Sequence, residues 1–302
     1  MTTPIVLDCD PGHDDAIALL LALASPEVEL LGVTTVHGNQ TLDKTTENAL
    51  RVLKLVGRAD VPVARGADRP LIRELHVAAH VHGESGLDGP ELPEATAKPV
   101  AEDAVDFLVE HAGAGVVVAA VGPLTNIARA LDAGMRPQRI VLMGGAIAEG
   151  NMTPAAEFNI WADPEAAQRV FHAGVPVTMV GLDVTHAALL TPAWAERFRA
   201  AGRVGTFVAE LVEFFKQYHL HTYGWDGAPI HDALALALTF RPELVRTEYV
   251  NVEVEVESEL CRGRTVVDRW RRSDRTPNAD VAVEVDADDF FELLLERVRS
   301  LG

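Results

Sequence analysis

The chain has 302 residues, of which 48% are hydrophobic and 24% charged, a composition typical of a globular protein with a sizeable core. Its formal charge of −19 repels nucleic acid and anionic membranes, so we expect neither as a partner. Two isolated cysteines, Cys9 and Cys261, exclude a disulfide framework. The N-terminus lacks a basic signal-peptide region, and no apolar run could span a bilayer. These features predict a cytoplasmic protein.

Apolar runs typical of buried strands alternate with helical segments over the first 185 residues. We expect strands at 5–10, 29–36, 61–64, 115–122, 139–145 and 175–185, and helices at 14–24, 42–56, 102–112, 123–134 and 163–174. Continuous apolar strands separated by helices indicate a parallel sheet that is covered on both faces. The polar stretch 76–99 shows no periodicity and is expected to be a loop.

The remainder of the chain follows a different pattern. Residues 192–240 are helical in pattern, whereas 249–259 and 264–270 alternate with period two, which favours an exposed antiparallel pair. A strand at 280–286 and a last helix follow. The sequence therefore predicts one α/β domain over residues 1–302. Its central sheet is mostly parallel, with helices on both faces and a small antiparallel annex.

Polar groups follow at least four of the predicted strands. They are found at 10–15, 37–39, 123–126 and 146–159, in each case directly after an apolar run. Ligands of open α/β sheets bind beyond the carboxyl ends of the strands. These four segments are therefore expected to meet around one binding site.

The segment "DCDPGHDD" holds four aspartates within eight positions, Asp8, Asp10, Asp14 and Asp15. Carboxylates this close repel one another, so either raised pKa values or a bound cation must offset the repulsion. A helix N-cap could explain Asp14 or Asp15 singly, but it does not explain Asp10 at the strand end. Oxygen ligands without nearby cysteine favour Ca²⁺ or Mg²⁺ over zinc.

Two other kinds of acidic site fit this segment less well. An EF-hand loop lies between helices and has glycine at its sixth position, whereas here a strand precedes and Pro11 intervenes. Phosphatases of the haloacid dehalogenase type also carry two aspartates at a strand end. Their motif continues with Thr or Val, where this chain has Pro11 and Gly12 followed by a second aspartate pair.

Eight motifs in family order extend the pattern over nearly the whole chain. They are "DCDPGHDDA" (8–16), "TTVHGNQ" (34–40), "HVHGESGLDG" (80–89), "VGPLTNIA" (121–128), "VLMGGAIAEGN" (141–151), "AEFNIWADPEAA" (156–167), "VGLDVTH" (180–186) and "IHDALAL" (230–236). With these motifs the chain resembles the inosine-uridine preferring nucleoside hydrolases, which cleave ribonucleosides into free base and ribose. The resemblance implies a soluble homo-oligomer, a tetramer or a dimer, acting in nucleoside catabolism and salvage.

The resemblance also implies a metal site and two catalytic residues. Asp10, Asp15, Asp232 and the main-chain carbonyl of Thr125 would hold one Ca²⁺, which compensates the crowded carboxylates. Asp10 would remove a proton from the attacking water, because calcium by itself acidifies water only modestly. His231, next to Asp232 in the chain, would protonate the leaving base.

Further residues are implied to bind the nucleoside. The resemblance assigns Asp14 and Asn159 to the ribose hydroxyls, Asn151 and Glu157 to the 5′-hydroxyl side, and Asn39 to the region between Asp10 and the ribose. It leaves Met143 open between packing and sugar contact, and places His82, His219 and Tyr223 near the base. Supporting roles are expected for Asp8, Asp183 and His186.

Two questions stay open at this point. The preference for purine or pyrimidine bases depends on loops around His82 and Tyr223 that sequence motifs do not describe. A non-catalytic calcium-dependent nucleoside-binding protein would keep the metal ligands but could discard the base. The presence of Asp10 favours the enzyme.

Overall fold

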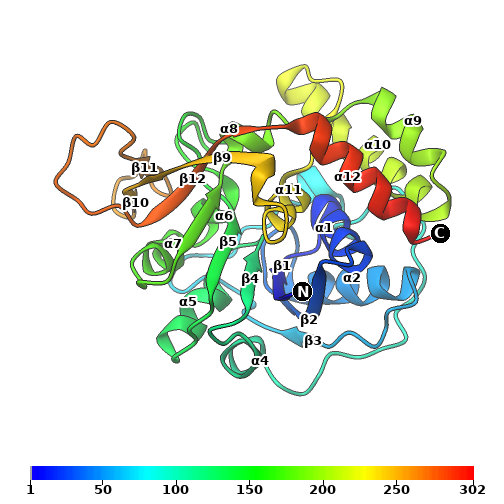
Figure 1. Cartoon of the computed structure of the whole chain (residues 1–302), viewed down its shortest axis with the longest axis horizontal. Helices are drawn as coiled ribbons and strands as arrows, with labels where there is room; N and C mark the ends of the chain where they lie inside the picture. Colours follow the sequence, from blue (N-terminus) through cyan, green and yellow to red (C-terminus); the bar gives the residue numbers. More distant parts are fainter. Residues whose placement is uncertain (1) are drawn as a thin grey trace.

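An eight-stranded sheet forms the centre of the computed structural model, which describes residues 2–302 (Figure 1). Its strand order is β3-β2-β1-β4-β5-β6-β12-β9. The parallel strands are β1 (Thr3–Cys9), β2 (Val28–Thr35), β3 (Val63–Arg65), β4 (Val117–Ala120), β5 (Arg139–Met143), β6 (Val177–Val180) and β12 (Ala279–Val285). The edge strand β9 (Val245–Val250) runs antiparallel to β12. The predicted fold class, an α/β domain with a mostly parallel sheet, is confirmed.

Helices cover both faces of the sheet, as the apolar strands predict (Figure 1). One face carries α1 (His13–Ala24), α2 (Leu42–Leu55), α9 (Pro192–Arg199), α10 (Arg203–Tyr223), α11 (His231–Ala237) and α12 (Ala287–Ser300). The other face carries α4 (Ala104–His111), α5 (Thr125–Asp132) and α7 (Pro164–Phe171). Successive residues of β1 alternate between the two cores, with Ile5 and Leu7 in the first and Val6 in the second.

Several short elements differ from the sequence-based prediction. The expected loop 76–99 contains helix α3 (Ala79–His82), and helix α6 (Phe158–Ala162) follows β5. The strand expected at 175–185 ends at Val180, because Gly181 starts a turn into helix α8 (Leu182–Thr185). The region 192–240 is interrupted by β8 (Ala228–Pro229), which pairs with β7 (Leu189–Leu190). A short 3₁₀ helix, Pro242–Leu244, precedes β9.

The antiparallel annex is smaller than predicted. Strands β10 (Val252–Val254) and β11 (Thr265–Val267) pair as expected and project from one end of the sheet (Figure 1). Residues 249–250, predicted to belong to this pair, instead end β9 in the main sheet. A one-sided edge strand shows the same period-two pattern as an exposed hairpin, which explains the error. Among residues 2–302, no helix is long and apolar enough to cross a membrane.

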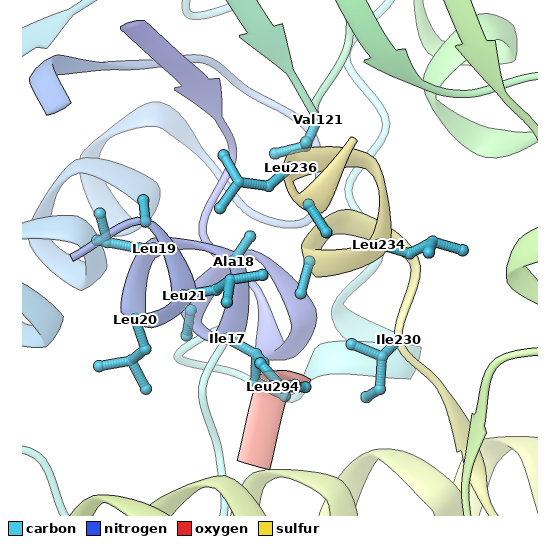
Figure 2. Close-up of a cluster of buried hydrophobic side chains, with 14 of the residues drawn as sticks. Ile17, Ala18, Leu19, Leu20, Leu21, Val121, Ile230, Leu234, Leu236 and Leu294 are labelled. Atoms are coloured by element: carbon cyan, nitrogen blue, oxygen red, sulfur yellow. The ribbon is translucent and has the colours of Figure 1, made fainter. Parts of the chain in front are cut away.

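Helices α1 and α11 pack against each other under the carboxyl ends of β1 and β4. Figure 2 shows Leu236 of α11 pointing toward α1, next to Val121, whereas Leu234 lies on the other side of α11. Helix α1 is apolar on all sides after its first turn, which is typical of a helix buried in a core. Strand β1 is the point at which the strand order reverses, and such switch points form the ligand crevices of open α/β sheets.

Candidate active site

A cavity of about 90 Å³, measured as the space open to the centres of water molecules, lies at this switch point. All residues that the sequence assigned to nucleoside binding line it: Asp14, Asn39, His82, Met143, Asn151, Glu157, Asn159, His219 and Tyr223. The two neighbours His231 and Asp232 line it as well. Three of the four segments predicted to meet, 10–15, 37–39 and 146–159, therefore contribute to one cavity, whereas 123–126 does not.

An acidic cluster forms one side of this cavity. Asp14, Asp15 and Asp232 each offer a carboxylate oxygen within 4.8 Å of the other two, and all three side chains are buried. The first two open α1 and the third opens α11, so the packing of these helices creates the cluster. Such a group of oxygens can hold a metal ion. It contains Asp15 and Asp232 of the predicted ligand set, and it has Asp14, expected at the ribose, in the place predicted for Asp10.

Asp10 is joined to this cluster through Asp15 and Asn39. The main-chain N–H of Asp10 donates to Asp15 Oδ1 at 3.0 Å, and Asn39 Nδ2 donates to Asp15 Oδ2 at 2.9 Å. The main-chain N–H of Asn39 donates to Asp10 Oδ2 at 2.6 Å. Asp10 Oδ1 is buried and has no hydrogen-bond partner. An acceptor left free in this way is a position where a cation or a water proton fits.

The electrostatics of the cluster also favour a compensating positive charge. Among the residues that the structure describes, no lysine or arginine lines the cavity. Burial, with repulsion from Asp15, raises the pKa of Asp14 to about 8 and that of Asp10 well above its usual range. Burial, with repulsion from Asp14, also raises the pKa of Asp232 well above its usual range. A bound divalent cation would restore the ionised forms, so the residues present fit a metal site.

Thr125 is not brought to the cavity. It is the first residue of α5, and its hydroxyl donates to Asp163 Oδ2 at 2.7 Å and lies 3.1 Å from His37 Nε2. The residue of the same loop that does line the cavity is Val121, whose carbonyl accepts from Asn159 Nδ2 at 2.8 Å. A Cβ added to Gly122 would lie 2.5 Å from Asp10 Oδ1, so the chain after β4 abuts the free oxygen of Asp10. The cavity lining therefore includes Val121 and not Thr125, the residue whose carbonyl was predicted to bind the metal.

The side of the cavity assigned to the sugar is built on α6. Glu157 caps this helix and accepts from the main-chain N–H groups of Asn159 (2.9 Å), Ile160 (3.1 Å) and Gly145 (2.9 Å). Burial raises the pKa of Glu157 to about 7. Asn159 Nδ2 also donates to the Met143 carbonyl at 3.1 Å, so its Oδ1 is left to accept from a ligand. Glu157 thus has a structural role in addition to its place in the cavity wall.

The opposite side carries His231 at the start of α11. Its Nδ1 lies 2.7 Å from the hydroxyl of Thr185, which ends α8. Burial, with repulsion from His186, lowers the pKa of His231 well below its usual range, so the ring is neutral near pH 7. When the Thr185 hydroxyl donates to Nδ1, the ring proton is on Nε2. His231 can then donate a hydrogen bond from Nε2.

Aromatic rings surround His231, and sequence motifs missed most of them. His186, expected only to support the site, lines the cavity, and its ring centroid lies 5.6 Å from that of His231. Tyr223 stacks on Trp225 at 4.6 Å, and His219 stacks beside both. Cavity-lining residues that sequence reasoning did not name are His80, Val81, Val121, Met152, Phe158, Phe215 and Tyr218, together with Ala78.

The remaining predicted support residues hold loops rather than line the cavity. Asp8 Oδ1 accepts from Thr34 at 2.5 Å and Asn126 at 2.8 Å, which connects the carboxyl end of β2 to the first turn of α5. Asp183 accepts from the main-chain N–H groups of Ile147 (2.6 Å) and Ala148 (3.1 Å) and so orders the loop after β5.

An α/β fold whose switch-point cavity combines a buried carboxylate cluster with amide and imidazole groups defines a metal-dependent hydrolase of a small polar substrate. Residues 5–292 match the family described as inosine-uridine preferring nucleoside hydrolase. The chain belongs to this family and is therefore a hydrolase of ribonucleosides.

Individual relatives cover essentially the whole chain. The pyrimidine-specific ribonucleoside hydrolase RihA of Enterobacter sp. (strain 638) is 50% identical over 309 residues, which are 99% of this chain and 98% of that protein. The solved purine-preferring ribonucleoside hydrolase from Gardnerella vaginalis is 37% identical, with a TM-score of 0.92 over 99% of each chain. The plant nucleoside hydrolase PpNRh1 is 32% identical, with a TM-score of 0.90 over 99% of each chain.

Proposed function

We propose that the chain is a calcium-dependent hydrolase that prefers pyrimidine ribonucleosides, such as uridine and cytidine, over inosine. The observation that carries the base preference is the 50% identity with pyrimidine-specific hydrolases over 99% of the chain, against 37% with a purine-preferring one. Family membership removes the alternatives of a non-catalytic nucleoside-binding protein and a haloacid dehalogenase type phosphatase.

Asp10, Asp15, Asp232 and the carbonyl of Val121 are proposed to hold the cation, with Val121 in the place first expected of Thr125. The free Asp10 Oδ1, the 4.8 Å grouping of Asp15 with Asp232, and the cavity position of Val121 support this set. An all-oxygen set of carboxylates and a carbonyl suits Ca²⁺ better than zinc. When bound, the cation compensates the carboxylates and makes a nearby water a better nucleophile.

Asp10 is also proposed to accept the proton of the attacking water. Its Oδ2 is already bound by the main-chain N–H of Asn39, so the carboxylate is held in one orientation with Oδ1 free. A base fixed in this way needs no reorganisation before the proton moves. Asn39 also holds Asp15, and therefore aligns the base with the neighbouring carboxylate.

Asp14, Asn151, Glu157 and Asn159 are proposed to bind the ribose. Asn159 offers Oδ1 and Asn151 offers its amide Nδ2, because the Oδ1 of Asn151 already accepts from the N–H of Phe158 at 2.9 Å. Fixing hydroxyls that do not react lets binding energy stabilise the oxocarbenium-like sugar in the transition state.

His231 is proposed to assist departure of the base from Nε2. As negative charge develops on the base, a hydrogen bond donated from Nε2 of the neutral imidazole strengthens and stabilises the departing base. Thr185 on Nδ1 orients the ring, and the stacked rings of His219, Tyr223 and Trp225 exclude water from this side. His82 lies on the same cavity wall.

A panel of natural nucleosides tests this proposal. The protein is incubated with uridine, cytidine, inosine, adenosine and guanosine in calcium buffer, and free ribose is measured. We expect ribose from every pyrimidine nucleoside, with a higher kcat/KM than from inosine. Higher kcat/KM for inosine would contradict the base preference, and no ribose from any nucleoside would contradict the catalytic proposal.

We also propose a homo-oligomer, a tetramer or a dimer, on the basis of family membership. Light scattering coupled to gel filtration gives the molecular mass directly. A mass equal to that of one chain at all concentrations would contradict this proposal.

A further inference from the structure

His13 contacts both ends of a loop, residues 82–88, and the first residue of this loop lines the cavity. Nδ1 of His13 lies 3.1 Å from Nδ1 of His82, which lines the cavity, and Nε2 of His13 lies 2.8 Å from the carbonyl oxygen of Asp88. The main-chain N–H of His13 also points at His82 Nδ1 from 3.2 Å. One buried ring thus connects the first helix to residues six positions apart in the loop.

The ring of His13 is held in a fixed orientation. It is parallel to the rings of Phe214 and Phe215, with centroids 5.1 Å and 5.5 Å away and interplanar angles of 4° and 2°. His82 stacks on Phe215 as well, at 5.2 Å. Stacking of this kind restricts rotation of both imidazoles, so the contact between them has one geometry.

The loop itself is a compact unit. The carboxylate of Asp88 accepts from the main-chain N–H groups of Glu84 at 2.9 Å and Ser85 at 3.1 Å. Gly83 has a φ of +78°, and a Cβ there would lie 2.1 Å from the Asp88 carboxylate. Because the loop is internally bonded, fixing Asp88 from outside also fixes His82.

The close approach of this loop to α1 is built into the sequence. A Cβ at Gly12 would lie 2.5 Å from His82 Nδ1 and 2.7 Å from Asn39 Nδ2. Glycine at this position therefore lets His82 reach the start of the helix that carries Asp14 and Asp15.

We propose that His13 is a positioning residue that holds His82 and its loop against the cavity. This inference rests on the proposed function, because it takes the substrate of the cavity to be a ribonucleoside. His13 is adjacent to Asp14, so the tether joins the cavity wall at His82 directly to the acidic cluster.

Three substitutions at one position separate the two contacts. His13→Leu keeps an apolar side chain in the core and removes both contacts. His13→Asn places a polar atom near the position of Nδ1, and His13→Gln places one near the position of Nε2. The matched control is His172→Leu, because His172 is an exposed histidine that bonds Glu253 far from the cavity lining.

Two measurements follow these variants: KM and kcat for uridine, and amide hydrogen exchange of residues 78–89 without substrate. For His13→Leu we expect KM to rise about tenfold and kcat to change less than threefold, as for loss of a neutral hydrogen bond that serves binding. Exchange should quicken in residues 78–89 and stay unchanged in α12. His13→Asn should restore KM, His13→Gln should restore slow exchange near Asp88, and His172→Leu should match the wild type.

The proposal is overturned if His13→Leu leaves both KM and loop exchange unchanged. It is also overturned if exchange rises throughout the chain and the melting temperature falls while KM is unchanged, since His13 would then be an ordinary core residue. If the wild-type protein releases no ribose from any nucleoside, the proposed function fails. The exchange comparison of wild type with His13→Leu would still decide whether the tether exists.

Discussion

Removing the divalent cation should make the stability of the protein depend on pH in a defined way. Without a cation, burial raises the pKa of Asp14 from an ordinary 3.8 to about 8. The folded protein then keeps this proton at pH values where the unfolded chain has already lost it. The raised pKa of Asp14 therefore does not lower the free energy of unfolding below pH 3.8, and it lowers this free energy increasingly as the pH rises toward 8.

The size of this effect follows from the shift. Each pH unit between the two pKa values costs about 1.4 kcal/mol, so Asp14, which titrates together with its acidic neighbours, removes on the order of 2–3 kcal/mol of stability between pH 5 and pH 7. For a chain of 302 residues, that loss lowers the melting temperature by about 4 °C. Asp10 and Asp232, whose pKa values are also raised by burial, add to it. With calcium bound the carboxylates are ionised against the cation, so this loss disappears.

The assay compares melting curves of metal-free and calcium-loaded protein at pH 5 and pH 7. Metal-free protein is prepared by chelation and dialysis, and its metal content is checked by mass spectrometry. We expect the gap between the two forms to widen by at least about 4 °C from pH 5 to pH 7, and calcium to restore the melting temperature better than magnesium. Equal curves at both pH values, from protein shown to hold no metal, would refute the reasoning.

Three further predictions concern residues of the cavity. His231→Ala should lower kcat on uridine about 10²–10³-fold. The same variant should barely affect 4-nitrophenyl riboside, because its leaving group departs as a stable anion, whereas Asp232→Ala should impair turnover of both substrates. Equal slowing of both substrates by His231→Ala would show that the histidine is a structural support. Uridine 5′-monophosphate should be turned over far more slowly than uridine. Asp14, Glu157 and Asp232 line the cavity and repel a phosphate group, and no lysine or arginine is present in the described lining. Comparable kcat/KM values for the two substrates would contradict this prediction. Asn39→Leu should weaken calcium binding about tenfold in a calorimetric titration, because Asp15 loses the hydrogen bond from Asn39 Nδ2. Unchanged calcium affinity would show that Asn39 does not support the metal site.

The order of the elements and the place of the site could be predicted from the sequence because both rest on local patterns. Apolar runs such as 117–120 can only be buried strands, and the carboxyl ends of parallel strands necessarily share one edge. The aspartates at 10–15 predicted a cation site at that edge, and the structure brings Asp14 and Asp15 to Asp232 there.

Features that depend on contacts between distant segments could not be predicted. His186 and Phe215 line the cavity because α8 and α10 pack around α11, and neither residue lies in a pattern that indicates a ligand. Val121 lines the cavity and Thr125 does not, which depends on where the chain turns after β4, and a motif does not specify that turn. The tether from His13 to Asp88 spans 75 residues and has no signature in either segment.

The position of β12 between β6 and β9 has a consequence for how the protein is made. During synthesis, β9 leaves the ribosome before β12. Until β12 has been made, β9 has no neighbour in the sheet and β6 is an unpaired edge strand. Unpaired edges of this kind are the sites at which nascent chains aggregate. Helix α12 then packs Leu294 against Ile17 under the helix that bears the aspartates (Figure 2). A nascent chain therefore contains every cavity residue before the fold can fix these residues in position. Activity should arise only when the last strand and the last helix have been added.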